Sequence, residues 1–266
     1  MKSLDPLLVT DNLLNELNTL AAPSMLAAAL QAIGAELGDA WPDRITLFSY
    51  SAEFREGARQ GDSVQIAYEE AHGRPPGDRA FRVYFSKAAN QLGRVGKWHL
   101  IFAAPHAARL LPYDLSQPAV DGRTDQELWR PEPMVAAGNV LEDAQALLWL
   151  AGQSARGYMK RLDQEFAGAA EDIVFRDDLS TRQYGGISVT MTLAGWPAQD
   201  QVLRCSLLYQ LPLLGQPKQD RKMHFHGVLV AEDRETTELL GTFRFTIVRL
   251  NGQRQAIYPD GSTEQR

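Results

Sequence analysis

An alanine-rich stretch at residues 22–38 limits the folds open to this chain more than any other feature. Its apolar side chains recur at helical spacing and alanine fills most of the other positions, which predicts a helix that is apolar on most sides. Pro23 suits the first turn of such a helix, and Gly38 suits its C-terminal stop. Because the segment carries a single charge, at Glu36, we expect a sheet to surround this helix.

The residues after this helix alternate in hydrophobicity with period two, as strands with one buried face do. One such pattern ends at Phe54, and the next begins after Gly61-Asp62, where the residue types favour a turn. Two further patterns run from Phe81 to Phe85 and from Trp98 to Phe102. The chain up to about residue 105 therefore reads as one helix followed by four strands.

A second helix and a second set of strands follow in the same order. A helical stripe runs from Leu141 towards Phe166, and Gly138 or Asn139 can cap its start. We allow for a break in this helix near Gly152 or Gly157, and for fraying of the tail from Gly252. The strand patterns that follow the helix lie at residues 173–175, 187–193, 202–211, 223–231 and 240–250.

The order of these elements predicts two domains, at residues 1–105 and 136–266. The residues between them, 106–135, contain four prolines and read as an irregular connector. We expect the two sheets to join side by side, because pairing protects the edge strand that each would expose alone. Since the halves share no repeat at the level of residues, two domains of unrelated kinds remain an alternative.

The run from Tyr50 to Ile66, Tyr-Ser-Ala-Glu-Phe-Arg-Glu-Gly-Ala-Arg-Gln-Gly-Asp-Ser-Val-Gln-Ile, resembles the segment after the helix in hotdog thioesterases and dehydratases. The resemblance implies an α+β fold of two tandem hotdog domains, each a long apolar helix wrapped by a curved antiparallel sheet. Residues 11–19 resemble the loop that, in the thioesterase branch, carries an acidic residue or a His-Val-Asn run just before the helix. In this chain Glu16-Leu17-Asn18 stands at that place, without the histidine.

This resemblance implies action on an acyl thioester of coenzyme A or acyl carrier protein, by hydrolysis, dehydration or acyl transfer, in a biosynthetic pathway. A thioester carbonyl needs little help: a residue that moves a proton and a backbone N–H at a helix start can suffice, and no cofactor is required. Burial of a carboxylate beside the helix start would raise its pKa towards the working range. The candidate catalytic residues are Glu16, Asp11 and Asn18, and the candidate substrate-binding residues are Ser24, Met25, Phe54, Gly61 and Asp62.

Two other interpretations stay open. Asp11, Glu16 and Asn18 could serve only as loop and capping residues, in which case the protein would bind an acyl group or a carrier protein without catalysis. Alternatively, His224 and His226 lie two residues apart on a strand and share a face, as they would in a metal-dependent β-barrel enzyme. Because one strand supplies only these two ligands, we expect a cross-strand pair on a solvated face and no tightly bound metal.

Composition excludes several classes of function. The net charge of −6 and the pI near 5.4 argue against a surface for nucleic acid. The lone Cys205 cannot form a disulfide framework, and no signal core or 18-residue apolar window occurs, so we expect a cytoplasmic protein that does not span a membrane. A homodimer is compatible with this interpretation. The sequence contains no P-loop, no Gly-x-Gly-x-x-Gly and no Gly-x-Ser-x-Gly.

Overall fold

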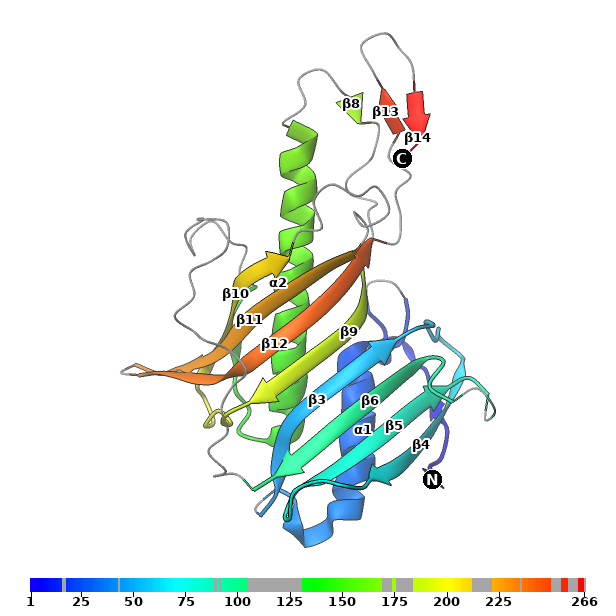
Figure 1. Ribbon diagram of the computed structural model, residues 1–266, viewed down its shortest axis with the longest axis vertical. Helices are drawn as coiled ribbons and strands as arrows, with labels where there is room; N and C mark the ends of the chain where they lie inside the picture. Colours follow the sequence, from blue (N-terminus) through cyan, green and yellow to red (C-terminus); the bar gives the residue numbers. More distant parts are fainter. Residues whose placement is uncertain are drawn as a thin grey trace.

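A computed structural model describes most of the chain. The described residues are 1–15, 18–42, 44–88, 90, 92–104, 131–168, 174–175, 184–211, 222–234, 236–249, 255–257 and 263–265. Within these ranges the chain forms one sheet of 11 strands, one sheet of 3 strands and two α-helices, which lie on the same face of the large sheet (Figure 1). The structure is therefore of the α+β class, with an antiparallel sheet.

The first half of the chain contains one helix and four long strands. In order they are α1 (Ala22–Leu37), β3 (Thr46–Phe54), β4 (Ser63–Ala71), β5 (Arg79–Ser86) and β6 (Gly96–Ala103). Two short strands and a 3-10 turn precede α1, namely β1 (Lys2–Ser3), β2 (Leu7–Leu8) and η1 (Asp11–Leu13), and the 3-10 turn η2 (Gly38–Ala40) follows it.

The second half repeats this order with a longer helix. Its main elements are α2 (Val140–Gly168), β9 (Tyr184–Leu193), β10 (Val202–Leu211), β11 (Lys222–Glu232) and β12 (Thr237–Arg249). The short strand β7 (Met134–Val135) precedes α2, and the small sheet consists of β8 (Val174–Phe175), β13 (Gln255–Ile257) and β14 (Thr263–Gln265).

The large sheet runs without interruption from one half into the other. Its strand order is β1-β4-β5-β6-β3-β9-β12-β11-β10-β7, with β2 also paired to β4. The first long strand after each helix lies at the inner edge of its half. At the centre of the joined sheet β3 therefore pairs antiparallel with β9, with Ser51 opposite Thr190. The expectation that the two sheets join side by side is confirmed.

Helix α1 has the bounds and the end signals that the sequence predicts. It spans 16 residues, carries its proline in the first turn, and ends at Gly38, whose φ is 55° and whose N–H bonds to the carbonyl of Gly34. This positive φ is readily adopted by glycine, which explains the stop. One face of α1 is buried against the sheet; its buried residues are Met25, Leu26, Ala29, Leu30, Ile33 and Leu37.

A β-bulge explains why the hydrophobic pattern of β3 changes phase. The register with β6 shifts between Leu47 and Ser49, so that one extra residue stands in β3. Leu47, at an odd position, and Tyr50, at an even one, are consequently both fully buried beneath the helices. The alternation of the sequence therefore indicates the buried face correctly on each side of the bulge, but the sequence contains no signal for the bulge itself.

Helix α2 begins as predicted but does not break. The Oδ1 of Asn139 accepts a hydrogen bond of 2.9 Å from the N–H of Glu142, which makes Asn139 the cap. The helix continues through Gly152 and Gly157, so the predicted break is wrong. A Cβ at Gly152 would lie 3.7 Å from the ring of Phe245, so this glycine lies where the helix packs on β12. Among the described residues, neither helix combines the length and apolar character needed to cross a bilayer.

Other expectations concern the irregular segments, and they either need correction or fall on residues that the structure does not describe. Most of the expected connector, namely residues 106–130, falls outside the described residues. Its last residues are ordered into β7, which pairs with β10. The tail is not simply frayed from Gly252, because β13 and β14 pair with each other and β13 pairs with β8. Such short pairings depend on partners far away in sequence, which is why local pattern did not indicate them.

Candidate functional site

Three segments converge at the start of α1. The N–H of Leu20 donates to the carbonyl of Ala58 over 2.7 Å, and the N–H of Arg55 donates to the carbonyl of Val95 over 3.2 Å. The N–H of Val9 donates to the carbonyl of Asp62 over 3.0 Å. The segment before α1, the loop between β3 and β4, and the loop between β5 and β6 therefore form one end of the first half.

The first turn of α1 has backbone N–H groups that no N-cap side chain binds. Its N-cap residue, Ala21, supplies no side-chain hydrogen bond, and Pro23 has no N–H to be satisfied. The N–H of Met25 donates to the carbonyl of Ala21 over 3.0 Å, so this amide already has a partner within the helix. The amide of Ser24, half-buried in the same turn, is the one that fits the expected role.

The predicted catalytic residues lie before this turn. Glu16 falls outside the described residues. Asp11 lies in η1 and is exposed, so it lacks the burial that the sequence led us to expect for a catalytic carboxylate. Asn18 is also exposed and has a φ of 54°, a conformation that asparagine tolerates better than most residues, and its N–H donates to the carbonyl of Asn15 over 2.9 Å.

Gly61 and Asp62 form the predicted turn, and their polar groups are bound to the protein itself. Gly61 has a φ of 83° and donates its N–H to the carbonyl of Val9 over 2.9 Å. The Asp62 carboxylate accepts the N–H of Arg59 at 2.8 Å and pairs with Lys87 at 3.0 Å. The bond from the Arg59 N–H, together with Lys87, lowers the pKa of Asp62. These contacts fix the turn and give both residues a structural role.

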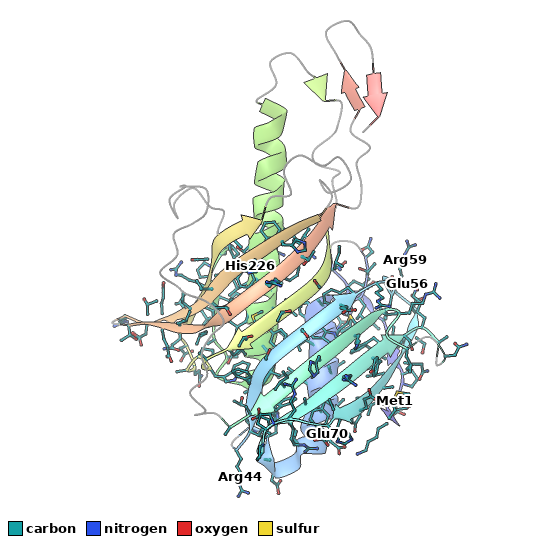
Figure 2. All side chains as sticks on the ribbon, in the orientation of Figure 1. Met1, Arg44, Glu56, Arg59, Glu70 and His226 are labelled. Carbon is teal, nitrogen blue, oxygen red and sulfur yellow. The ribbon has the colours of Figure 1, made fainter. Side chains whose placement is uncertain are left out.

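The two loops at this end are locally cationic. Residues 55–62 and 87–95 contain four cationic side chains, Arg55, Arg59, Lys87 and Arg94, against two carboxylates, a net charge of +2, whereas the sequence of the third segment contains the acidic residues 11 and 16. Glu56 pairs with Lys87 at 3.4 Å and with Arg94 at 3.1 Å. Figure 2 shows Glu56 and Arg59 together at this end of the sheet.

Helix α2 from the second half also reaches the start of α1. The side-chain amide of Gln145 donates to the carbonyl of Pro23 over 3.3 Å. Tyr50, fully buried in β3, donates its hydroxyl to the carbonyl of Ala144 over 3.3 Å. The sequence offered no signal for either contact, because the partners lie 122 and 94 residues apart. The first turn of α1 thus lies at the junction of the two halves.

The start of α2 contains a buried carboxylate, Asp143, beside the capping residue Asn139. Asp143 is 2% exposed and accepts the N–H of Ala137 at 2.8 Å. Burial raises the pKa of Asp143, while hydrogen bonds from the N–H groups of Ala137, Gly138 and Asn139 oppose the rise. This carboxylate therefore holds the loop that leads into α2.

The two histidines of β11 lie on the face away from the helices. His226 stands opposite Arg244, whereas its neighbour Phe225 lies in the core. His224 Nδ1 lies 3.0 Å from Thr246 Oγ1, which is a cross-strand contact of the kind expected. The expectation of a solvated position is wrong for His226, which is 1% exposed. Burial lowers the pKa of His226 to about 4, and Arg244 and His224 add to the effect.

No metal centre is visible around these histidines. Within the ranges that the structure describes, no three His, Cys, Asp or Glu side chains gather in a way that could hold a metal ion.

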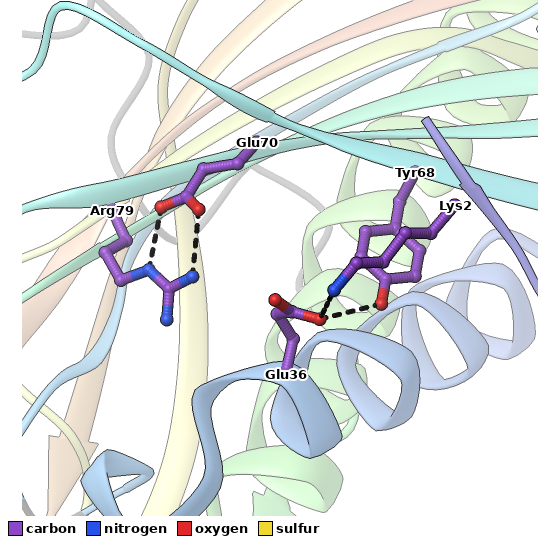
Figure 3. Close-up of polar contacts among 5 residues, drawn as sticks. All are labelled: Lys2, Glu36, Tyr68, Glu70 and Arg79. Atoms are coloured by element: carbon purple, nitrogen blue, oxygen red, sulfur yellow. Dashed lines mark hydrogen bonds and ion pairs between the residues drawn. The ribbon is translucent and has the colours of Figure 1, made fainter.

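The single charge of α1 has a structural partner at the other end of the helix. Glu36 accepts hydrogen bonds from Lys2 at 2.5 Å and from Tyr68 at 3.0 Å, which attach β1 and β4 to the helix (Figure 3). Arg79 and Glu70 form a two-bonded pair nearby, at 2.7 and 2.9 Å. Because these groups lie near the C-terminal end of α1, they stabilise the fold and are not part of the candidate site.

Solved structures with the same arrangement cover nearly the whole chain. The 12:0-ACP thioesterase from Umbellularia californica is 8% identical and has a TM-score of 0.55, with 92% of this chain and 96% of that chain covered. An acyl-CoA thioesterase II from Mycobacterium marinum is 12% identical with a TM-score of 0.53, covering 90% of each chain. A conserved protein of unknown function with a hot dog fold, from Alicyclobacillus acidocaldarius, is 12% identical with a TM-score of 0.50, covering 92% of each chain.

At the level of sequence, no protein-family model matches the chain, and no curated protein matches it significantly. The evidence for the fold is thus three-dimensional: the sheet, the helices on one of its faces and the near-complete coverage of these structures. The resemblance that the sequence shows around Tyr50 to Ile66 agrees with it. The chain has the hotdog fold of these solved structures.

Proposed function

We propose that this protein hydrolyses an acyl thioester of coenzyme A or of acyl carrier protein. The observation that carries the proposal is the uncapped first turn of α1, which lies at the junction of the two halves and beside cationic loops. A helix start presents N–H groups and a partial positive charge, which stabilise the oxyanion that forms when a thioester carbonyl is attacked. The fold shared with an acyl-CoA and an acyl-ACP thioesterase supports this assignment.

The proposal includes two tandem hotdog domains, at residues 1–105 and 136–266, with residues 106–135 between them. The mirrored strand orders, β4-β5-β6-β3 and β9-β12-β11-β10, support this division. Each helix lies against the sheet of its own half (Figure 1). A two-domain arrangement of this kind brings the start of α1 against α2, as the bond between Gln145 and Pro23 illustrates.

In this mechanism a carboxylate of the lead-in segment, Glu16 or Asp11, activates water for attack on the carbonyl. Asn18 helps to position that water or the substrate, and the amide of Ser24 polarises the carbonyl oxygen. Phe54, half-buried at the end of β3, contacts the acyl group. The second candidate function, binding without turnover, is favoured by the exposure of Asp11 and by the lack of a histidine in this segment.

The cationic loops support a substrate whose carrier, coenzyme A or acyl carrier protein, bears a phosphate group. Coenzyme A and acyl carrier protein both present phosphate close to the thioester arm, and Arg55, Arg59, Lys87 and Arg94 lie at the end of the sheet where α1 begins. Such charges attract an anionic partner and raise its association rate. A role in cytoplasmic biosynthesis and assembly as a homodimer belong to the same proposal. Dehydration and acyl transfer are the alternative reactions on the same class of substrate.

Release of free thiol from a panel of acyl-coenzyme A and acyl-carrier-protein thioesters tests the proposal directly. The protein contributes little background to a thiol reagent, because its one cysteine, Cys205, is buried and burial raises its pKa to about 12. Formation of an enoyl thioester from a 3-hydroxyacyl substrate would identify dehydration instead. Binding of a carrier without any turnover would instead support the second candidate function, binding without catalysis.

The catalytic carboxylate is identified with matched variants. Loss of a general base lowers the rate by about 10² to 10⁴, so either Glu16→Gln or Asp11→Asn should reach this range while thermal melting stays unchanged. Asp39→Asn is the control, because Asp39 lies in η2 at the other end of α1. Full turnover in both lead-in variants would contradict the assignment of the base without contradicting the reaction.

A further inference from the structure

Trp98 carries a polar atom whose situation the fold does not explain. Its side chain is fully buried, and its Nε1 has no hydrogen-bond partner among the described residues. Trp196 shows the usual arrangement, because its Nε1 donates to the carbonyl of Leu47 over 3.2 Å. A buried donor without an acceptor loses its hydrogen bonds to water and gains none in exchange, which is unfavourable for folding. Such a group is retained more readily where a ligand completes it.

The position of Trp98 connects this donor to the candidate site. Trp98 lies two residues after Gly96 on the helix-facing side of β6, and Gly96 supports the side chain of Met25 from the second turn of α1. Phe54 stands opposite Gly96 in the sheet and packs edge-on against the indole, with ring centroids 5.8 Å apart. Trp98 is therefore placed beneath the start of α1.

Helix α2 of the second half lies on the other side of Trp98, beyond Tyr50. Tyr50 lies next to Trp98, with ring centroids 6.1 Å apart, and its hydroxyl is already used by the carbonyl of Ala144 in α2. Phe54, Trp98 and Tyr50 thus form a continuous aromatic row from the half-buried end of β3 to the junction with α2. Within this row the indole N–H is the polar group that the protein leaves without a partner among the described residues.

We propose that the Trp98 Nε1–H donates a hydrogen bond to an oxygen of an acyl group bound beneath the start of α1. The inference rests on the proposed action on acyl thioesters and names a contact within that site. An indole nitrogen donates and does not accept, so the ligand must supply an acceptor such as a carbonyl oxygen. An acyl thioester has one at its reacting carbon, and a 3-oxoacyl thioester has a second one further along the chain.

Two side chains provide a route to the indole. Met25 has three rotatable bonds and a polarisable thioether, so it adapts its shape to a neighbour more readily than a branched residue. Because Gly96 has no Cβ, the end of Met25 occupies space that another residue would fill. Phe54 is half-buried and lies at the end of its strand. An acyl chain that displaces these side chains reaches Trp98 directly.

The test compares Trp98→Phe with Trp196→Phe in the full chain. Trp98→Phe removes the N–H but keeps an aromatic ring, so the free protein should melt at the same or a higher temperature. It should also lower turnover by about 10² to 10³, the loss typical of removing one donor to an oxyanion, if the partner is the reacting carbonyl. Trp196→Phe removes a satisfied N–H, so it should lower the melting temperature and leave turnover unchanged.

A spectroscopic measurement does not depend on turnover. The probe is dodecanoyl-coenzyme A in which a CH₂ replaces the thioester sulfur, so that the carbonyl remains but cannot be hydrolysed. The chain has 5 tryptophans, and the indole N–H resonance of Trp98 is assigned by its loss in Trp98→Phe. On saturation with the probe this resonance should move downfield, as it does when an N–H gains an acceptor. The same titration with the 3-oxo form of the probe tests the second oxygen.

The outcomes separate the two claims. A shift with both probes assigns the reacting carbonyl as the partner, and a shift with the 3-oxo probe alone assigns the oxygen of the chain; either result supports the inference. If the probes bind with wild-type affinity to Trp98→Phe and the Trp98 resonance does not move, the inference is overturned while the proposed function stands. If the wild-type protein neither binds nor turns over any acyl carrier, both are overturned.

Discussion

Gln145 of α2 donates its side-chain amide to the carbonyl of Pro23, in the first turn of α1, over 3.3 Å. The two residues belong to different halves of the chain and are 122 positions apart. The bond places the second helix against the start of the first, where the candidate site lies. It shows that both halves meet at this point, although the predicted site residues all come from the first.

Replacing Gln145 should loosen this junction. Gln145→Leu keeps most of the side-chain volume and removes the donor, so we expect a loss of about 0.5 to 1.5 kcal/mol in the free energy of unfolding. Denaturant unfolding measures the difference. Gln31→Leu is the control, because Gln31 is exposed on α1 and should change stability little. Equal stability of both variants would mean that the bond contributes nothing.

Two glycines should respond in opposite directions to alanine. A Cβ at Gly241, in β12, would overlap the carbonyl oxygen of Thr192 in β9, and a backbone atom cannot move aside as a side-chain end can. Gly241→Ala should therefore cost about 1 to 3 kcal/mol. A Cβ at Gly152 would meet only ordinary contacts at 3.7 Å, so Gly152→Ala should stabilise the helix by up to about 1 kcal/mol. Thermal melting of the two variants decides whether this close approach of β9 and β12 is as described.

The carboxylate of Asp143 should matter more for stability than its neighbour. It is buried and accepts N–H groups of residues 137–139, so Asp143→Ala leaves those donors without an acceptor. We expect a loss of about 1 to 3 kcal/mol per donor left buried and unsatisfied. Glu142→Ala, at an exposed position in the same turn, should change the free energy of unfolding by less than about 0.5 kcal/mol. Comparable losses in the two variants would show that Asp143 stabilises the protein through the helix dipole and not through its hydrogen bonds to the loop.

His226 should make the protein less stable as the pH falls. Its pKa is about 4 in the folded chain against an ordinary value of 6.5, so the unfolded chain binds a proton at a pH where the folded chain does not. Stability contributed by the neutral ring is present above about pH 6.5 and is lost between 6.5 and 4. His226→Gln should reduce the slope of stability against pH in this window, whereas His224→Gln should leave most of it. Melting curves across the window in both variants provide the measurement, and identical slopes in wild type and His226→Gln would contradict the assignment.

Local pattern was sufficient for most of the helices and strands. The spacing of apolar residues in α1, its proline and its terminal glycine fixed both ends of the helix, because each of these features acts within a few residues of chain. The turn at Gly61 and the cap at Asn139 were predictable for the same reason. The order of helix and strands, read together with the run from Tyr50 to Ile66, was enough to indicate the hotdog fold.

The tertiary structure decided everything that depends on which segments meet. It brought Gln145 to Pro23 and Tyr50 to Ala144, and it used the Met25 amide within the helix. It also buried His226 and left the Trp98 N–H without a partner among the described residues. A sequence records which side chains can bury or bond, but the partner of each is set by strand register and helix packing. Those are properties of the whole sheet, because moving one strand by a single residue turns every side chain on it to the opposite face.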